Sequence, residues 1–210
     1  MVRVKVCGIT NHDDAALAAG LGAYALGFIF APSPRRITPE KARKIIEALP
    51  PFVKTVGVFV NERPDAVRRI MGFCGLDLVQ FHGDEPPGMC EEFMPQVIKT
   101  FRVKDDSSLS AIPPYQGKIR AVLLDTYVKG QPGGTGKVFD WNIAARARAR
   151  GIPVILSGGL TPYNIGAAVS RARPCGVDVN SGVEEHPGRK DHLLMEELMK
   201  VVGKGRKGWR

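Results

Sequence analysis

Short apolar runs rich in valine, isoleucine and leucine recur along the chain, and segments with helical spacing of apolar residues separate them. Runs of this length indicate buried strands, and their alternation with helical segments is typical of repeated βα units on a parallel sheet. We count eight such units. The predicted strands are Val2–Val6, Tyr24–Phe30, Lys54–Val60, Asp77–Phe81, Val97–Phe101, Ile119–Leu124, Pro153–Leu156 and Gly176–Val179.

Helical segments follow these strands, and two of them are preceded by a threonine and a proline. Thr38-Pro39 and Thr161-Pro162 each offer a capping hydroxyl followed by a proline suited to the first helical turn. The predicted helices are Asp13–Gly20, Pro39–Leu49, Pro64–Phe73, Pro87–Phe93, a weak one near Ser108, Asn142–Arg150, Pro162–Arg171 and His192–Val202.

Eight strands that are each followed by a helix predict an α/β protein with a single (β/α)8 barrel, and 210 residues is near the lower end for that fold. The alternative is an open doubly wound sheet, which would need a glycine-rich phosphate loop after the first strand. Cys7-Gly8-Ile9-Thr10 supplies one glycine where three are needed. We therefore expect one barrel domain over residues 1–203.

Two other glycine-rich stretches resemble nucleotide-binding loops without their context. Gly20–Ala25 matches a dinucleotide pattern but follows a helix and leads into a strand, so it is interpreted as a helix stop. Gly133–Val138 lacks the first glycine of a P-loop, and Val138 stands where a Ser or Thr should hold magnesium. We expect a lid after the sixth strand there, with Gly134, Thr135 and Gly136 in it.

The net charge of +9 changes this picture little, because four of the excess cations fall in the glycine-rich stretch 204–210. We expect a disordered basic tail there and no nucleic-acid partner, although weak polyanion binding stays an alternative. The chain begins without a signal-peptide pattern and has no apolar run long enough to cross a bilayer, which predicts a cytoplasmic protein without a membrane partner. Its four cysteines form no C-x-x-C pair, and its histidines form no ligand cluster, so no metal site is expected.

In a barrel the chemistry lies at the carboxyl ends of the strands, and the ends of strands seven and eight commonly bind phosphate through backbone N–H groups. Each of these groups alone could be only a turn or a helix cap. Together they predict a phosphorylated small-molecule ligand. The residues concerned are Gly158 and Gly159 after strand seven, and Asn180, Ser181 and Gly182 after strand eight.

Cys7 and Asp125 end strands one and six, which are well separated around a barrel. Either residue alone could be structural, since an isolated strand cysteine is often a small buried hydrophobe and a carboxylate at a strand end can cap a turn. Together they suit one acid and one base that act on neighbouring atoms of a substrate. Lys5 points to the same side as Cys7 by strand alternation. His82, at the end of strand four with Gln80, is interpreted as a packed or solvated imidazole.

At this point the chain resembles the phosphoribosylanthranilate isomerase family of tryptophan biosynthesis. The matching blocks run in order from residue 2 to about Asp191. They are Val4–Thr10, Gly27–Phe30, Ser33–Ile37, Val56–Asn61, Val79–Gly83, Leu124–Thr126, Gly134–Lys137, Phe139–Trp141, Leu156–Leu160 and Asp178–Glu184.

The resemblance implies a cofactor-free Amadori rearrangement of N-(5′-phosphoribosyl)anthranilate to 1-(2-carboxyphenylamino)-1-deoxyribulose 5-phosphate. It implies Asp125 as the general acid for the furanose ring oxygen and Cys7 as the general base at C2′. Arg36 matches the cation that receives the anthranilate carboxylate, whereas Arg35 beside it is interpreted as a surface charge. Asp178 matches an acidic residue above strand eight, and Gln80 is a further candidate for substrate contact.

Two alternative functions are also compatible with the sequence. A related barrel isomerase that acts on both tryptophan and histidine intermediates would use two aspartates, and Cys7 occupies one of those places. A non-catalytic protein that binds phosphate ligands or polyanions has only the basic tail in its favour. Tyr24 replaces a common aspartate of the family at the amino end of strand two, far from the predicted site. A monomer and a homodimer are both compatible with the sequence.

Overall fold

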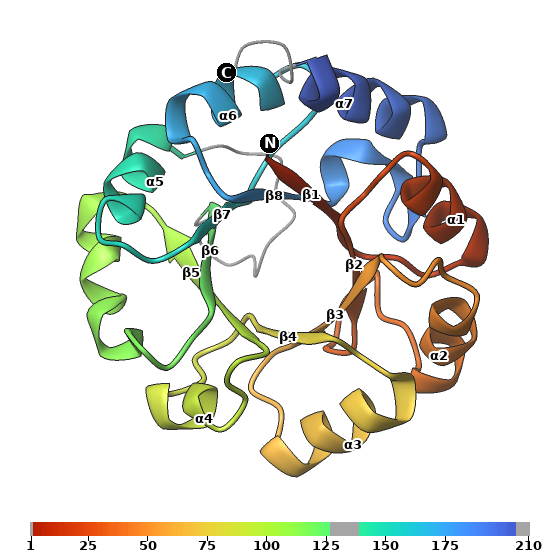
Figure 1. Ribbon diagram of the computed structural model, residues 1–210, viewed down its shortest axis with the longest axis horizontal. Helices are drawn as coiled ribbons and strands as arrows, with labels where there is room; N and C mark the ends of the chain where they lie inside the picture. The colour runs from red at the N-terminus through yellow and green to blue at the C-terminus, as the bar shows by residue number, and fades with distance from the viewer. Residues whose placement is uncertain (1, 127–138, 205–210) are drawn as a thin grey trace.

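The computed structural model describes residues 2–126 and 139–204. Its eight parallel strands close into one barrel in chain order, with β8 paired to β1, and Figure 1 looks down this ring of strands inside a ring of helices. The predicted (β/α)8 barrel is confirmed. The strands are β1 Arg3–Val6, β2 Ala25–Ile29, β3 Lys54–Phe59, β4 Leu78–Phe81, β5 Val97–Val103, β6 Ala121–Thr126, β7 Val154–Leu156 and β8 Gly176–Val179.

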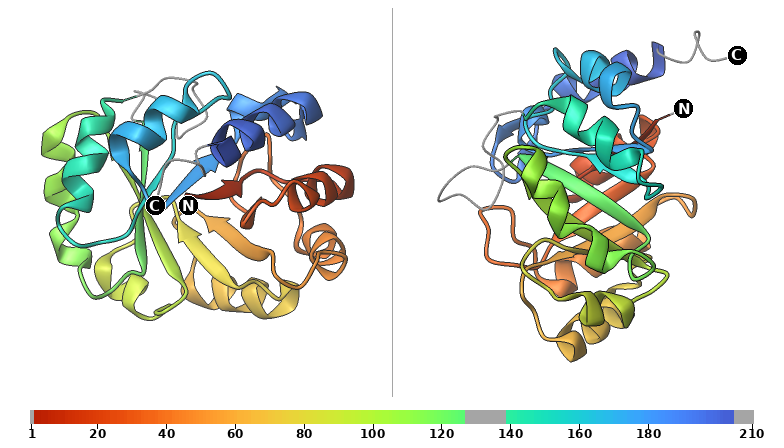
Figure 2. Two further views of the ribbon diagram at one scale, coloured as in Figure 1. Left: turned by 45° about the horizontal axis from the view of Figure 1, so that its top comes forward. Right: turned by 90° about the vertical axis from the view of Figure 1, so that its left-hand side faces the viewer.

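The helices cover the outside of the barrel on all sides (Figure 2). They are α1 His12–Gly20, α2 Pro39–Glu47, α3 Pro64–Cys74, α4 Pro87–Glu91, α5 Trp141–Arg148, α6 Ile165–Ala172 and α7 His192–Lys204. Two 3-10 helices, η1 Asp106–Ala111 and η2 Pro113–Tyr115, stand between β5 and β6, where the sequence indicated a weak helix. A third, η3 Ser181–Val183, leads from β8 into a two-stranded sheet of β9 Glu184–His186 and β10 Arg189–Lys190, which the sequence did not predict.

Helix α7 ends at Lys204, one residue beyond the predicted end of the barrel. The rest of the tail predicted over 204–210 lies outside the described residues. None of the described helices is long and apolar enough to span a membrane.

Of the two helix starts predicted from a threonine followed by a proline, one is confirmed and one is wrong. Thr38 caps α2, where its side chain accepts a hydrogen bond from the N–H of Lys41 and Pro39 takes the first turn, as predicted. The start of α6 at Pro162 is wrong, because the helix begins at Ile165. Asn164 explains the delay: its side chain accepts from the Thr161 N–H and donates to the Gly159 carbonyl, which holds residues 159–164 as a loop.

The side chains of the strands form two apolar layers. The large one lies between the strands and the helices, and it includes Phe28 of β2, Phe81 of β4 and Leu124 of β6. A small one of Ile98, Ala121 and Leu123 is packed by Leu78 and Ile155. Since side chains alternate along a strand, the small layer faces the inside of the barrel and closes it beneath the carboxyl ends of the strands. Above this small layer, the inward-facing positions of the strands carry polar side chains.

A buried ion pair braces the loop after β4. Lys99 of β5 lies 3.1 Å from Glu85, and both side chains are almost fully buried. The Glu85 carboxylate also accepts hydrogen bonds from the backbone N–H groups of Asn61 and Gly83, and Lys99 donates to the Gly83 carbonyl at 2.7 Å. The pair therefore satisfies backbone groups of the loops after β3 and β4 and fixes the end of β4 in place.

We expect Glu85→Ala to lower the free energy of unfolding by about 3 to 5 kcal/mol, because it leaves the Lys99 charge buried without a partner. Denaturant unfolding followed by circular dichroism measures this change. Glu196→Ala is the control: it breaks the exposed pair with Lys200 on α7 and should cost about 0.5 kcal/mol or less. Equal losses in the two variants would contradict the bracing role of Glu85.

Candidate active site

A cavity of about 280 Å³ opens at the carboxyl ends of the strands. It brings most of the predicted site residues together from β1, β4, β6, β7 and β8. Arg36 is not among its lining residues, and Gly134, Thr135 and Gly136 lie outside the described residues. The predicted residues that line it are Cys7, Gln80, Asp125, Gly158, Gly159, Asp178, Asn180, Ser181 and Gly182.

An ion pair joins the first and last strands beneath the cavity. Lys5 of β1 and Asp178 of β8 are partners in the strand register, and the Lys5 Nζ lies 2.7 Å from Asp178 Oδ1 with both side chains buried. Cys7 is two residues beyond Lys5 on the same face. A Cβ added at Gly27 of β2 would lie 2.7 Å from the Cys7 Sγ and 3.0 Å from Lys5 Nζ, so glycine at this position makes room for both groups.

The pKa values of this group follow from burial and charge. Burial raises the pKa of the Cys7 thiol; the Lys5 ammonium opposes this by its charge and a hydrogen bond, while the Asp178 carboxylate adds to the rise. For Lys5, burial alone would lower the pKa, but the charges of Asp178 and Cys7 outweigh it and raise the pKa above its ordinary value. Lys5 therefore keeps its proton at neutral pH, and a positive charge faces the thiol.

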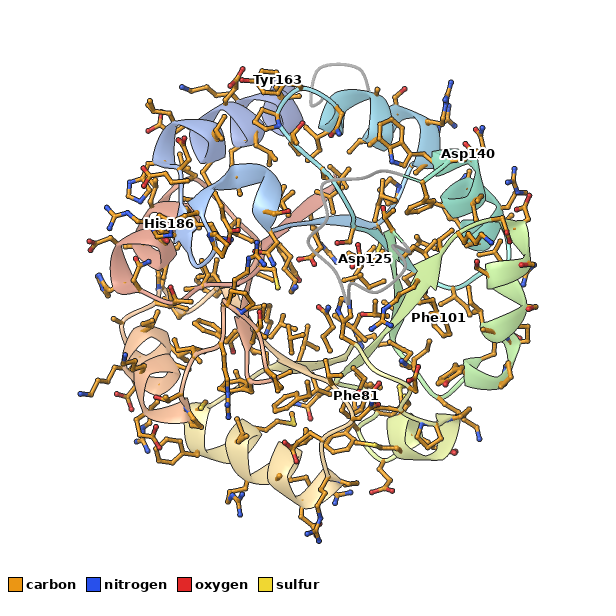
Figure 3. The ribbon with its side chains drawn as sticks, turned by 180° about the vertical axis from the view of Figure 1, so that it is seen from behind. Phe81, Phe101, Asp125, Asp140, Tyr163 and His186 are labelled. Carbon is orange, nitrogen blue, oxygen red and sulfur yellow. The ribbon has the colours of Figure 1, made fainter. Side chains whose placement is uncertain are left out.

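Asp125 stands across the cavity on β6. The structure places it inside the strand, which runs on to Thr126 where the prediction ended it at Leu124. Its Oδ1 accepts a hydrogen bond from the Thr126 N–H at 2.8 Å, and its Oδ2 lies 3.4 Å from the His82 Nε2. Figure 3 shows Asp125 inside the ring of strands, whereas Tyr163 lies at the outer rim. The backbone thus holds Oδ1 of the carboxyl group, and Oδ2 is turned into the cavity.

Gly158 makes this position of Asp125 possible. Its φ is +88°, and a Cβ there would lie 2.6 Å from the backbone nitrogen of Thr126 and 2.9 Å from Asp125 Oδ1. Any other residue would push the loop after β7 away from the carboxylate and strain the backbone. The glycine that the sequence assigned to phosphate binding therefore also packs against the predicted acid.

His82 is a site residue that the sequence analysis left as a packed or solvated imidazole. The structure places it in the cavity wall, where Gln80 Nε2 lies 3.1 Å from its Nδ1 on one side and Asp125 faces its Nε2 on the other. The sequence held a signal for this, because Gln80 and His82 lie two residues apart at the end of β4 and thus share a face. Both side chains turn inward.

The loops after β7 and β8 meet closely. Gly158 and Gly159 both have positive φ, at +88° and +62°. A Cβ on Gly182 would collide with the Leu160 carbonyl, so only glycine allows the two loops to touch. The side-chain Oδ1 of Asn180 accepts a hydrogen bond from Lys190 Nζ at 2.9 Å. Two segments of glycine-rich backbone thus lie side by side at one end of the cavity, in the arrangement expected for an anion.

A charged network supports these loops from below. Lys190 of β10 is fully buried and donates to Asn180 and to Glu184 of β9. Burial lowers the pKa of Lys190, although Glu184 opposes it. Burial would raise the pKa of Glu184, but hydrogen bonds and charge from Arg35 and Lys190 keep it below its ordinary value. Hence the carboxylate stays ionised between two cations.

Arg35 and Arg36 lie in different environments. The surface position expected for Arg35 is wrong: its Nε and Nη2 both donate to Glu184 Oε2, at 2.9 and 2.7 Å, and the residue lines the cavity. Arg36 is exposed at the end of the same loop and makes no hydrogen bond or ion pair with its side chain among the described residues. The reason is the β9–β10 hairpin, whose Glu184 the sequence analysis did not place.

No group of three or more His, Cys, Asp or Glu side chains that could hold a metal ion occurs within residues 2–126 and 139–204. The titratable groups that line the cavity are a thiol, two carboxyls, an imidazole and a guanidinium. This set can donate and accept protons around a bound anionic molecule.

The comparisons with known proteins point to one family. The family described as N-(5′-phosphoribosyl)anthranilate (PRA) isomerase matches residues 4–201. A relative from Geobacter sulfurreducens, named N-(5′-phosphoribosyl)anthranilate isomerase, is 52% identical over 210 residues and covers 100% of both chains. One from Pelobacter propionicus with the same name is 48% identical over 203 residues and covers 96% of each chain.

Solved structures agree with this. The crystal structure of phosphoribosyl anthranilate isomerase from Thermotoga maritima matches with a TM-score of 0.91 at 42% identity, over 97% of this chain and 100% of the other. A structure of such an isomerase in complex with reduced 1-(o-carboxyphenylamino)-1-deoxyribulose 5-phosphate matches with a TM-score of 0.88 at 41% identity, with the same coverage. The family match spans nearly the whole barrel, and a relative whose sequence is 52% identical covers the full chain. This chain therefore belongs to the phosphoribosylanthranilate isomerase family.

Proposed function

We propose that the chain isomerises N-(5′-phosphoribosyl)anthranilate to 1-(2-carboxyphenylamino)-1-deoxyribulose 5-phosphate, a step of tryptophan biosynthesis, with Asp125 as general acid and Cys7 as general base. One observation carries this assignment. The Cys7 thiol is buried beside the Lys5 ammonium group and faces the cavity from the β1 side of the barrel. The Asp125 carboxyl group faces the same cavity from β6, and glycine-rich backbone lies between the two along the rim. The chemistry needs a proton donor and a proton acceptor at neighbouring substrate atoms, and no redox step.

Asp125 opens the sugar ring. The proton on its Oδ2, the oxygen that the Thr126 N–H leaves free, passes to the furanose ring oxygen. The bond between C1′ and that oxygen breaks, and the lone pair of the anilino nitrogen forms a C1′=N iminium. The acid becomes a carboxylate, and the ring oxygen becomes a hydroxyl.

Cys7 completes the rearrangement as a thiolate. It removes the proton from C2′, and the electrons of that C–H bond form a C1′=C2′ double bond while the C1′=N electrons return to nitrogen. The product is the enol form of the aminoketose. Because burial raises the pKa of the thiol, the thiolate needs the Lys5 ammonium, which opposes that rise by its charge and a hydrogen bond.

The substrate's two anionic ends have separate partners in this proposal. Backbone N–H groups of the loops that contain Gly158, Gly159, Ser181 and Gly182 bind the phosphate, with Asn180 held below by Lys190. Arg36 receives the anthranilate carboxylate, since the neighbouring Arg35 is already engaged by Glu184. Asp178 and Gln80 line the cavity between these ends and contact the ribose part.

We further propose a small phosphorylated molecule as the only substrate class, with no cofactor, no nucleic-acid or membrane partner, and a cytoplasmic location. The protein works as a monomer or a homodimer. A Thermotoga maritima relative, at 40% identity and a TM-score of 0.87, is described as monomers generated from a dimeric isomerase, which supports both states.

Substitution of the acid and the base is the direct test. Cys7→Ser and Asp125→Asn should each lower kcat by about 10²-fold or more, because each removes one proton transfer. The fluorescence decay of freshly generated phosphoribosylanthranilate measures the rate, and circular dichroism checks the fold. A variant that keeps the wild-type rate would remove that residue from the mechanism.

The charges beside Cys7 should move its pKa in opposite directions. Asp178→Asn removes a carboxylate that raises the thiol pKa, so the pKa should fall. Adding Lys5→Met in the same chain removes the ammonium that lowers it, so the pKa should rise again. Ultraviolet thiolate absorbance measures both, with Cys7→Ala subtracting the other cysteines.

The base is active as thiolate, so its contribution grows as pH rises through the thiol pKa. The activity profile of Asp178→Asn should accordingly begin its rise at lower pH than that of the double variant. Identical thiol titrations in the two variants would show that Lys5 does not tune Cys7.

Arg36→Met should raise KM by about tenfold or more and change kcat little, because a charge-assisted contact to the carboxylate is lost from both the ground and the transition state. Arg43→Met is the matched control, since Arg43 pairs with Glu47 on the outer face of α2. A KM unchanged from wild type in Arg36→Met would count against the anthranilate contact.

A further inference from the structure

Among the residues that line the cavity, two buried side-chain polar atoms have no hydrogen-bond partner in the described part of the chain. They are His82 Nε2 and Gln80 Oε1. Gln80 is almost fully buried, and His82 is mostly buried in the cavity wall. Leaving a buried donor or acceptor unpaired costs about 1 to 3 kcal/mol, so such atoms in a cavity wall point to a role during ligand binding or chemistry.

Gln80 determines which ring nitrogen of His82 carries the proton. Its side-chain nitrogen lies 3.1 Å from His82 Nδ1 and donates to Thr100 Oγ1 at 3.4 Å. An amide nitrogen is a donor only, so Nδ1 must accept. A neutral imidazole then carries its proton on Nε2, the nitrogen that faces Asp125 Oδ2 at 3.4 Å.

We propose that His82 is a positioning residue that acts through Asp125, a role that rests on Asp125 being the general acid. As Oδ2 gives its proton to the substrate, the His82 Nε2–H donates to the carboxylate that forms, and the distance shortens from 3.4 Å. The Thr126 N–H already holds Oδ1. Donors fixed in advance where charge develops stabilise a transition state more than they stabilise the ground state.

The surroundings of Cys7 leave His82 no comparable role there. The groups whose charges act on the thiol are Lys5, Asp178 and Lys190. His82 instead follows β4 directly, with hydrogen-bonding neighbours on β4 and β5 and with Asp125 of β6 facing its Nε2. It therefore belongs to the acid side of the site.

Kinetics of two His82 variants test the proposal. His82→Ala should lower kcat by about 10²-fold with KM nearly unchanged, as for the loss of one preorganised donor. His82→Gln should recover most of that loss, because a glutamine amide nitrogen can donate near the position of Nε2. His12→Ala, which removes an exposed imidazole on α1, is the matched control. A Gln variant as slow as the Ala variant would overturn the proposal.

The Asp125→Asn variant distinguishes a failure of the His82 proposal from a failure of the proposal that Asp125 is the general acid. If His82 acts through Asp125, adding His82→Ala to Asp125→Asn should cause little further loss. A further loss of the full size would show that His82 acts independently, and would overturn the proposal while leaving Asp125 as the acid. A wild-type rate in Asp125→Asn alone would overturn the assignment of the acid, and the proposed role of His82 with it.

The tautomer provides a readout that does not depend on activity. Nitrogen-15 NMR of the imidazole rings should show the His82 proton on Nε2 in the wild-type protein, with the His82→Gln spectrum identifying its signals. Gln80→Glu should move the proton to Nδ1 or add a second one, because a carboxylate accepts where the amide donates. A wild-type His82 that carries its proton on Nδ1 alone would overturn the proposal.

Discussion

The ion pair between Lys5 and Asp178 is the contact on which the rest of the site depends. It lies where the last strand of the barrel meets the first, and both charges are buried. Buried charges are costly unless they are paired and hydrogen-bonded, so each holds the other in place. Because Cys7 follows Lys5 by two residues on the same face, the pair also brings an ammonium group to the thiol.

The barrel keeps the proposed acid and the proposed base apart. Cys7 and Asp125 come from strands β1 and β6, so neither can move toward the other without opening the sheet. Two kinds of support hold them: charged neighbours beside the thiol, and a backbone N–H with an imidazole beside the carboxyl. Glycines at 27 and 158 leave the space that each group occupies. The fold therefore determines the separation of the two groups that we propose as acid and base.

Much of this could be predicted because the signals are local. Apolar runs and helical spacing located all eight strands, and strand ends then located Cys7 and Asp125. The predictions that failed have different physical causes. The delayed start of α6 follows from local hydrogen bonds of the Asn164 side chain to the Thr161 N–H and the Gly159 carbonyl, which a helix pattern does not reveal. The burial of Arg35 follows from Glu184, which lies 149 residues away in the sequence. The position of His82 two residues after Gln80 indicates that it faces inward, but its approach to Asp125 of β6 joins residues far apart in the sequence and could not be predicted.

In the proposed mechanism, Asp125 opens the ring and Cys7 then removes the C2′ proton. Single-turnover fluorescence decay with substrate that carries deuterium at C2′ tests it most directly, in Cys7→Ser and in Asp125→Asn. We expect a full isotope effect in Cys7→Ser, where proton removal becomes slow, and a diminished one in Asp125→Asn, where ring opening becomes slow. The reverse pattern would contradict the assignment of acid and base.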